Sequence, residues 1–440
     1  MKSRDTALNI LRTLYAGGFE AWLVGGCVRD ELRGAAPKDF DIATNARPEQ
    51  VEALFPKTIG VGKCFGVMLV LEGGGQFEVA TFRAESGYAD GRRPDTVTFG
   101  DAKADALRRD FTINGLFLNP ITGELRDWVG GEADLKAGVL RTIGDPAERF
   151  GEDHLRLLRA VRFAAQLDFQ IELATFAAVQ EHAEKINRVS AERIRDELLK
   201  LFRPPHAARG LDLLRDSGLL AYVLPEMMLT IGCEQSPEYH PEGDVYKHIR
   251  LMLKTMAEGA PAELPWTILL HDIAKPATAA VGEDGCIHNY GHDKLGAEMT
   301  EVILERLKFP RKQIDEIVFT VREHMHLAVA PKMRKAKLRR ILLRPTFELE
   351  LEQHRIDCLG SHAKLDIYDF LRAEQAALEE IPAVLKPLVT GRDLIELGVE
   401  PGPPMGKLLN EIRDRQLAEE FSTRDEALAW VKDAKEKTAQ

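Results

Sequence analysis

Long apolar runs are missing from this 440-residue sequence: no stretch of about 18 residues or more is continuously apolar, so no membrane span is predicted. Cysteine is also scarce, with five residues and no Cys-x-x-Cys pair. Few, widely spaced cysteines argue against a disulfide framework or a zinc ribbon and favour reduced thiols in the cytoplasm. The N-terminal segment 1–22 lacks the basic and continuously apolar regions of a signal peptide.

Basic charge is not in excess either, since the formal net charge is −11 at pH 7. Phosphate contacts need Lys and Arg, so local patches would have to carry any RNA. Hydrophobic residues make up 45% and charged residues 29% of the sequence, which is ordinary for a globular protein. A chain of 440 residues is too long for one hydrophobic core and should divide into about two to four domains.

The chain changes character along its length. Residues 20–120 alternate short β-rich runs with turn signals and helix-like pieces, which is typical of a mixed α/β domain. From about residue 145 onward, apolar residues recur at helical spacing and strand patterns nearly vanish. We therefore predict an α/β head followed by all-α modules. The predicted boundaries are 1–145 for the head, 146–225 for a helical neck, and 226–365 and 366–440 for two further helical parts.

Two carboxylates stand close together where a strand is predicted. Asp39 and Asp41 flank Phe40, and residues i and i+2 of a strand point to the same face. Both could hold the same Mg²⁺ ions, because this cation prefers oxygen ligands and binds substrate phosphates beside one or two carboxylates. Alone, Asp-x-Asp more often marks solvated side chains. Glu78, in the strand predicted at 76–83, is a third ligand or another solvated carboxylate.

A glycine turn precedes these carboxylates. Gly25 and Gly26 follow a predicted strand and open a helix that carries Arg29. Glycines at such a turn let backbone N–H groups approach a phosphate, and an arginine adds a charge-assisted hydrogen bond. The plain alternative is a tight strand–helix turn. A glycine turn and Asp-x-Asp about a dozen residues apart form a rarer combination than either alone.

The segment LVGGCVRDELRGAAPKDFDIAT (23–44) resembles the signature of polymerase-β-like nucleotidyltransferases. More narrowly, it is similar to the bacterial-type (class II) tRNA CCA-adding enzymes and their relatives, the bacterial poly(A) polymerases. Four further blocks match the same pattern in the same order, at 88–99, 107–117, 149–166 and 191–202. The resemblance implies a polymerase-β-like head, an all-α neck, an HD body and a helical RNA-binding tail.

The resemblance also implies an activity and the residues that carry it. The expected reaction adds CMP and AMP, from CTP and ATP, to the 3′ end of tRNA without a template. Asp39 and Asp41 would hold catalytic Mg²⁺, and Gly26 and Arg29 would contact phosphates. Arg108, Arg109 and Asp110 would lie beside the incoming nucleotide, Asp110 reading the ribose 2′-hydroxyl, and Glu85 to Pro94 would form a flexible loop.

Base selection is assigned to a predicted helix over 152–162. Asp153, Arg156 and, less directly, Arg159 share a helix face, with Arg162 one turn further. Cytosine and adenine both present an amino donor beside a ring-nitrogen acceptor, whereas uracil and guanine present the opposite pattern. Asp153 would accept from the amino group and Arg156 would donate to the ring nitrogen. The alternative is a surface salt bridge between these two residues.

Histidines gather in the second half of the sequence. Six residues there, at intervals that resemble an HD domain, are the predicted ligands of a second, transition-metal site: His248, His271, Asp272, His292, His324 and Asp357. Imidazole and carboxylate ligands suit metals of intermediate softness. In some CCA-adding enzymes an HD body hydrolyses phosphates such as 2′,3′-cyclic ends. A fold can outlive its chemistry, so inactivity is the alternative.

Three alternatives to CCA addition stay open. The first is a poly(A) polymerase, although the segment 55–70 looks more like the CCA-adding version. The second is a partial enzyme that adds only CC or only A, and the third is an HD phosphohydrolase with an RNA-binding head. Seven basic residues between Lys332 and Arg344 are either an RNA-backbone patch or a solvated helix face.

Overall fold

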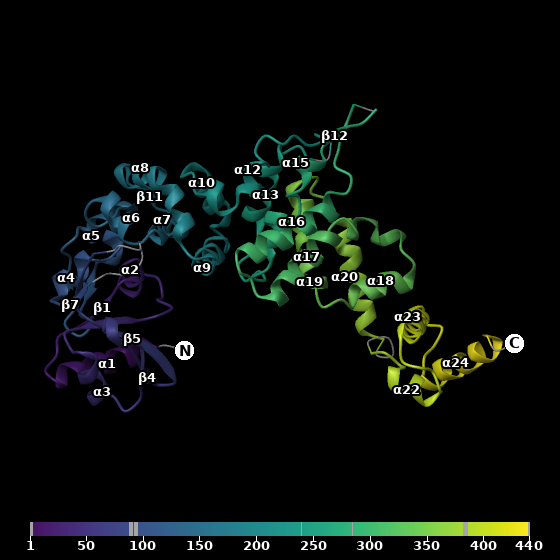
Figure 1. The fold of residues 1–440 in the computed structure, drawn as a ribbon, viewed down its shortest axis with the longest axis horizontal. Coiled ribbons are helices and arrows are strands. Elements are labelled where there is room, and N and C mark those ends of the chain that lie inside the picture. The colour runs from purple at the N-terminus through teal and green to yellow at the C-terminus, as the bar shows by residue number, and fades with distance from the viewer. Residues whose placement is uncertain are drawn as a thin grey trace. The chain divides into compact units, whose positions relative to one another are not determined.

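The computed structural model describes residues 3–87, 91, 96–238, 240–283, 285–381 and 386–438. The chain divides into two compact units, Met1–Pro225 and Glu226–Gln440. An α/β part followed by a helical part confirms the predicted fold class (Figure 1). The finer division of the chain into four domains stays a prediction.

The first unit is built on a mixed seven-stranded sheet in the order β3-β4-β5-β2-β1-β8-β9. Its strands are β1 (Ala21–Val24), β2 (Asp41–Thr44), β3 (Thr58–Gly62), β4 (Val67–Glu72), β5 (Gly75–Thr81), β8 (Phe117–Leu118) and β9 (Leu125–Arg126). Strand β1 is antiparallel to β2 and β8, and the central strand β2 is parallel to β5. A separate hairpin joins β6 (Arg83–Ser86) to β7 (Thr96–Phe99).

Alternation along the strands sends side chains to two different cores. Leu23 and Ile42 pack in the larger core, to which α1 (Arg4–Ala16) and α3 (Pro48–Leu54) contribute apolar side chains. Trp22 and Ala43 pack in the smaller core on the other face, with α4 (Ala102–Leu107). Because residues i and i+2 share a face, Asp41 belongs to the face of Ala43.

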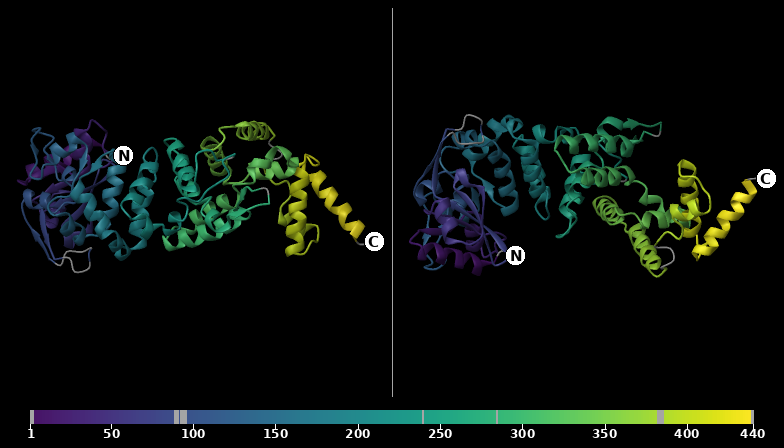
Figure 2. Two further views of the ribbon diagram at one scale, coloured as in Figure 1. Left: turned by 90° about the horizontal axis from the view of Figure 1, so that it is seen from above. Right: turned by 60° about the horizontal axis from the view of Figure 1, so that its bottom comes forward.

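Helices complete both units (Figure 2). The first unit continues with α2 (Gly26–Leu32), α5 (Gly131–Ala137), β10 (Val139–Leu140), α6 (Pro146–Glu152), α7 (Leu155–Leu167), β11 (Gln170–Ile171), α8 (Leu173–His182), α9 (Ala191–Leu201), α10 (Ala207–Asp216) and α11 (Leu220–Val223). After α12 (Pro225–Met228), the second unit has α13 (Val245–Thr255), α14 (Leu264–Leu270), α15 (Lys275–Thr278), β12 (Ala280–Val281), β13 (Ile287–His288), α16 (His292–Arg306), α17 (Arg311–Glu323), α18 (Lys335–Leu342), α19 (Phe347–Gly360), α20 (Asp366–Glu379), α22 (Gly391–Glu396), α23 (Pro403–Leu417) and α24 (Arg424–Thr438).

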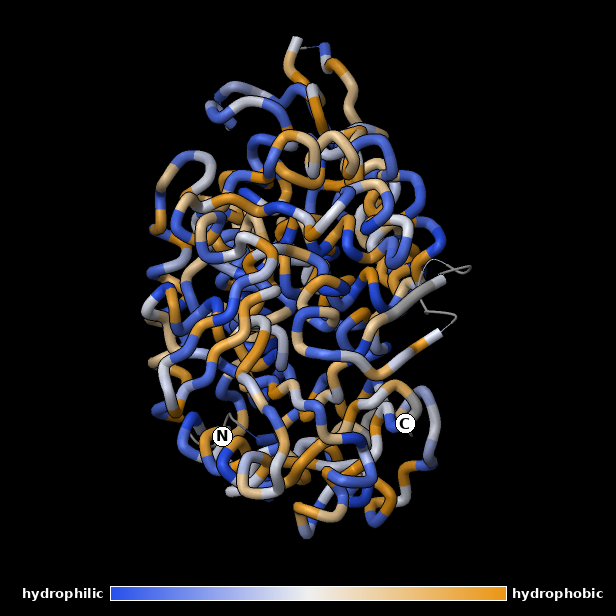
Figure 3. The backbone as a smooth tube through the Cα atoms, turned by 90° about the vertical axis from the view of Figure 1, so that its left-hand side faces the viewer, coloured by the Kyte–Doolittle hydropathy of each residue, from blue (hydrophilic) through white to orange (hydrophobic). Residues whose placement is uncertain are grey.

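Hydrophobic and hydrophilic residues alternate at short intervals along the chain (Figure 3). Among the residues that the structure describes, no helix is both long enough and apolar enough to cross a membrane. The continuous helix predicted over 152–162 is wrong: α6 ends at Glu152 and α7 begins at Leu155. Asp153, between the two helices, has an extended backbone with φ −143° and ψ 107°.

Candidate active site and candidate metal centre

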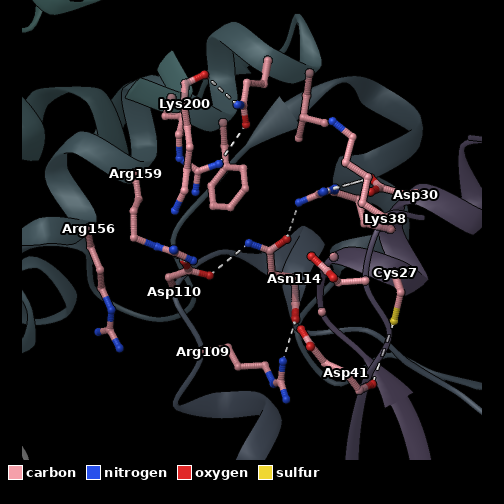
Figure 4. Close-up of a pocket in the computed structure, with 18 of the residues that line it drawn as sticks. Cys27, Asp30, Lys38, Asp41, Arg109, Asp110, Asn114, Arg156, Arg159 and Lys200 are labelled. Atoms are coloured by element: carbon pink, nitrogen blue, oxygen red, sulfur yellow. Dashed lines mark hydrogen bonds and ion pairs between the residues drawn. The ribbon is translucent and has the colours of Figure 1, made fainter. Parts of the chain in front are cut away.

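A cavity of about 1040 Å³ lies within the first unit. It is lined by α2, the segment that leads into β2, the segment after α4, and the helices α7 and α9 (Figure 4). Every residue predicted for the head site lines this one cavity. They are Gly26, Arg29, Asp39, Asp41, Arg108, Arg109, Asp110, Asp153, Arg156, Arg159 and Arg162.

The two carboxylates reach the cavity in different ways. Strand β2 begins at Asp41, so Asp39 precedes the strand and the prediction that both enter it is wrong for Asp39. Phe40, between them, is buried in the larger core. Because the side chain of Phe40 lies in the core, its two neighbours point away from the core, and both line the cavity. Their oxygen donors fit the hard ligand set that Mg²⁺ prefers.

Glu78 lies beside Asp41 in the sheet, because the two residues are register partners in the parallel pair β2–β5. The two line a smaller cavity of about 180 Å³ together with Arg108 and Arg109. A carboxylate on the neighbouring strand is therefore within the same group of side chains as Asp41. This position is compatible with a third acidic ligand, which stays a prediction.

The glycine turn is explained by crowding and by backbone conformation. Gly25 caps α2 with φ +73°, a region that residues with a side chain rarely adopt. A Cβ at this position would lie 3.3 Å from Nη1 of Arg109 and 4.0 Å from Oδ2 of Asp41. Glycine here keeps Arg109 close to the turn and to the carboxylate. Arg29, on the following helix, donates to Asn114 Oδ1 at 2.9 Å and to Asp30 Oδ1 at 2.9 Å.

Asp105 positions the two arginines of the 107–117 block, and the sequence analysis did not identify it. Its fully buried carboxylate accepts from Arg108 at 2.6 Å and from Arg109 at 2.9 Å. Burial raises the pKa of this carboxyl, but the charges of Arg109 and Arg108 outweigh burial, and the net pKa is lowered. The i, i+3 and i, i+4 spacing within α4 and its C-cap was the available signal.

Asp110 is engaged by a neighbouring helix. Its Oδ2 accepts from Nε of Arg159 at 2.8 Å, and its Oδ1 accepts from Nδ2 of Asn114 at 3.1 Å (Figure 4). Burial raises the pKa of Asp110, but the charge of Arg159 and the Asn114 hydrogen bond lower it well below the usual range. Asn114 also accepts from Arg29, so this residue connects the glycine turn to the Asp110–Arg159 pair.

The predicted base-selecting residues line the cavity but do not pair as the surface salt bridge would require. Asp153 Oδ2 accepts from Arg193 at 2.7 Å, across to α9. Arg156 pairs with Glu152 and donates to the backbone oxygens of Arg149 and Arg108, at 3.0 and 3.2 Å. The break between α6 and α7 gives these two side chains separate partners.

Arg162 forms a buried ion pair with Glu197 of α9. It therefore joins α7 to α9 at the wall of the cavity. The predicted block at 191–202 supplies both Arg193 and Glu197, which the sequence analysis did not single out. The loop predicted at 85–94 falls largely outside the described residues, which leave out 88–90 and 92–95.

The second unit brings all six residues of the predicted HD site together. His248 Nε2 lies 3.1 Å from Asp357 Oδ1, and His271 Nε2 lies 3.1 Å from Asp272 Oδ2. His292 Nε2 and His324 Nε2 lie 3.5 and 4.0 Å from the other oxygen of Asp272. Two groups of three result, each with ligand atoms within 4.8 Å of one another: His248, His271 and Asp357, and Asp272, His292 and His324.

The four imidazoles share one hydrogen-bonding pattern. Each Nδ1 faces an acceptor: Glu242 for His248 at 2.6 Å, and backbone oxygens for His271, His292 and His324 at 2.9, 2.6 and 2.6 Å. With Nδ1–H donated outward, Nε2 is the nitrogen that each ring turns to the cluster. This is the arrangement of metal-ligating histidines, whose outer nitrogen is fixed by a neighbouring acceptor. Burial lowers the pKa of His248, but its contacts with Asp357 and Glu242 outweigh burial and raise the pKa to about 9, so a metal at this nitrogen would replace a proton.

Further features of this cluster are compatible with a bound cation. The buried Nε2 of His248 has no hydrogen-bond partner among the described residues, although a carboxylate oxygen is close. The Nε2 atoms of His292 and His324 lie 3.2 Å apart. Burial and the neighbouring charge of His271 lower the pKa of His324 to about 4, so its lone pair is available at neutral pH. Lys275, missed by the sequence analysis, donates toward Asp272 at 2.6 Å.

Known proteins match both units. Family models match at residues 21–141 (Poly A polymerase head domain), 168–229 (RNA- and SrmB-binding site of polymerase A) and 294–431 (tRNA nucleotidyltransferase domain 2). The chain is 33% identical over 412 residues to the CCA-adding enzyme of Levilactobacillus brevis, covering 93% of this chain and 92% of the relative. The chain belongs to the family of CCA-adding enzymes.

Other members of this family match over different lengths. The CCA-adding enzyme of Lactobacillus helveticus is 45% identical over 214 residues, which are 48% of this chain and 53% of that protein. The crystal structure of the Bacillus stearothermophilus CCA-adding enzyme in complex with CTP superposes with a TM-score of 0.74 at 28% identity. That superposition covers 100% of this chain and 99% of the other, so the family fold extends over both units.

Proposed function

We propose that this chain adds CMP and AMP, from CTP and ATP, to the 3′ end of tRNA without a template. The observation that carries the proposal is that Asp39 and Asp41 line the same cavity as the arginines of α7 and of the segment after α4. Membership of the CCA-adding family supports the substrates. We also propose a cytoplasmic location, because the cytoplasm holds the pools of tRNA, ATP and CTP.

In the proposed reaction, the 3′-hydroxyl oxygen of the RNA attacks the α-phosphorus of the nucleotide. A bond from that oxygen to phosphorus forms, the bond between the α-phosphorus and the bridging oxygen breaks, pyrophosphate leaves, and the hydroxyl proton passes to water. Mg²⁺, when held by Asp39 and Asp41, supplies positive charge that lowers the pKa of the hydroxyl and offsets charge on the phosphates. Arg109, fixed by Asp105, lies beside the glycine turn to bind the nucleotide phosphates.

For base selection, we propose that Asp153 accepts from the amino group of cytosine or adenine and Arg156 donates to the ring nitrogen. Uracil and guanine would set donor against donor and acceptor against acceptor, leaving charged groups unpaired in the pocket. Asp153→Ala, assayed with all four nucleoside triphosphates, tests this role. We expect UTP and GTP incorporation to rise by at least tenfold relative to CTP. Unchanged exclusion of both would contradict it.

The poly(A) and partial-addition alternatives are tested directly by product length. tRNAs that lack one, two or all three terminal nucleotides are incubated with CTP and ATP, and the products are resolved to single nucleotides. Complete CCA ends on all three substrates support the proposal. A long A tail indicates a poly(A) polymerase, and stalling after CC or a requirement for preformed CC indicates a partial enzyme. Asp41→Ala should abolish every addition.

A second function is favoured by the shared hydrogen-bonding pattern of the four imidazoles, in which each Nδ1 faces an acceptor. We propose that His248, His271, Asp272, His292, His324 and Asp357 hold a transition metal and that this centre hydrolyses phosphoesters such as 2′,3′-cyclic ends. The full chain is tested with Mn²⁺, Ni²⁺ or Co²⁺ and a 2′,3′-cyclic nucleotide. Turnover that Asp272→Asn removes and Asp41→Ala retains supports the proposal. Absence of turnover with every metal would remove the hydrolase.

A further inference from the structure

An aromatic pair borders the cavity of the second unit, and neither proposed function uses it. The rings of Tyr290 and His288 are stacked, with centroids 5.2 Å apart and an interplanar angle of 10°. Tyr290 is 82% exposed. Both residues line the cavity of about 630 Å³ that the predicted metal ligands also line. An exposed, flat aromatic surface therefore opens onto the same space as the His/Asp cluster.

The backbone around Tyr290 is hydrogen-bonded to a residue of the His/Asp cluster. The carbonyl oxygen of Asn289, the preceding residue, faces Nδ1 of His292 at 2.6 Å. Gly291, the following residue, adopts φ +79° as the N-cap of α16, whose first residue is His292. His288 ends β13 and pairs with Ala280 of β12. These contacts hold the backbone on both sides of Tyr290 beside the cluster.

We propose that Tyr290, stacked on His288, is a platform for the nucleobase of a nucleotide whose phosphate lies against the His/Asp cluster. This inference rests on the proposed metal site of the second unit. Bases stack on aromatic side chains with little regard to sequence, because every base has a π-face. The ligand class is therefore a nucleotide, either free or at the 3′ end of an RNA.

The rest of the cavity suits such a ligand. Met325, which is 51% exposed, and Ile287 add apolar lining beside the aromatic pair. Lys275, whose Nζ is bound by Asp272 and Gln235, lies in the wall of the same cavity. A cavity of about 630 Å³ is in the size range of sites for organic ligands and is larger than a bare phosphate needs. Inorganic phosphate or pyrophosphate would make no use of the stacked rings.

The test measures equilibrium binding of guanosine 3′-monophosphate to the full chain in the presence of Mn²⁺. Guanine is chosen because the proposed base selection in the head opposes it. Tyr290→Ala should weaken binding about tenfold, and Tyr290→Trp should restore it to within about threefold. Affinity for inorganic phosphate should stay unchanged in both variants. Tyr222→Ala is the matched control, since Tyr222 is an exposed tyrosine of α11 outside this cavity.

A short RNA with a 3′-terminal guanosine 3′-phosphate forms the second arm. A loss confined to the mononucleotide identifies a free nucleotide as the ligand, and a loss that extends to the RNA identifies an RNA end. Equal affinity of wild type and Tyr290→Ala for both ligands overturns the platform, as does an equal loss for inorganic phosphate. The metal content of the same samples is measured as a separate test of the proposed metal site. If no metal is bound, the affinities of wild type and Tyr290→Ala can still be compared.

Discussion

The carboxylate of Asp153 accepts a hydrogen bond of 2.7 Å from Arg193, which reaches across from α9. Asp153 stands in the break between α6 and α7, where its other oxygen accepts from the backbone N–H of Leu155 at 3.1 Å. Both oxygens are thus held, each by one partner. The position of this carboxylate depends on a second helix, and base selection should depend on that helix as well.

We therefore expect Arg193→Ala to weaken base selection without removing nucleotidyl transfer. Loss of the guanidinium leaves Asp153 with one fixed oxygen, so the carboxylate samples more orientations toward the base. The ratio of CTP to UTP incorporation should fall about tenfold, which corresponds to about 1.4 kcal/mol, with a smaller change in CTP turnover. Arg195→Ala on the same helix is the control, because Arg195 pairs with its exposed neighbour Asp196. An unchanged ratio in Arg193→Ala would show that Asp153 needs no such support.

The glycine turn gives a second prediction. Gly25→Ala should destabilise the first unit by about 1 to 3 kcal/mol, because φ +73° with ψ −132° is a conformation that residues with a side chain rarely adopt. It should also raise KM for CTP, because the new methyl group would press on Arg109. Gly74→Ala is a matched control with φ +75° and open space around the Cβ position. Equal KM values for the two variants, measured beside thermal unfolding, would show that crowding at Arg109 is unimportant.

The sequence predicted side chains that the structure brings to one cavity of the first unit, but not how those side chains pair. Motifs identify side chains such as Asp41 and Arg109, because each chemistry needs a particular residue type. The helix break at Asp153 was not predicted, since the spacing of Asp153 and Arg156 also fits one continuous helix. Partners distant in the sequence, such as Arg193, follow from the packing of α7 on α9, which a local pattern does not reveal.

The second unit shows the same limit. Histidine spacing predicted six residues as metal ligands, and the structure brings all six together; their binding of a metal stays a proposal. Glu242, which holds Nδ1 of His248, carries no such signal, because an isolated glutamate in a turn is usually solvated. The alternation of strands and helices was enough to predict an α/β head. The order of strands in the sheet could not be predicted, because it depends on pairings such as the parallel one between β2 and β5.

Low pH should reduce the contribution that the ion pairs of Asp105 make to the stability of the fold. The pKa of Asp105 is lowered in the folded state, so its contribution to stability is complete above the ordinary carboxyl pKa of 3.8 and is lost as the pH falls toward the folded value. Asp105→Asn should cost about 3 kcal/mol at pH 7, and this deficit should shrink below about pH 4. Urea unfolding at pH 7 and pH 3.5 measures both. The exposed Asp196→Asn should change neither value, and a pH-independent deficit in Asp105→Asn would contradict the assignment.

Metal binding should depend on Glu242. Because its carboxylate fixes the Nδ1–H of His248, Glu242→Gln should weaken Mn²⁺ binding about 10- to 100-fold while leaving the fold intact. Metal titration of the chelator-treated chain, followed by calorimetry, gives the affinity. Glu238→Gln is the control, since Glu238 lines the same cavity and is exposed. If both variants bind Mn²⁺ as wild type does, the outer contact of His248 plays no part in holding a metal.

The basic segment 332–344 is partly committed to internal contacts, which neither sequence interpretation foresaw. Arg339 is buried, donates to the carbonyl of Leu417 at 2.9 Å and pairs with Glu419 at 2.9 Å, so it fastens α18 to the end of α23. Arg339→Ala should lower the stability of the second unit by about 1 to 2 kcal/mol, because the carboxylate left behind is partly exposed, and should speed hydrogen exchange in α23. Lys337, an exposed residue of the same helix, is the control, and Lys337→Ala should alter neither quantity. Equal exchange in the two variants would mean that the buried guanidinium of Arg339 contributes nothing measurable to holding α23.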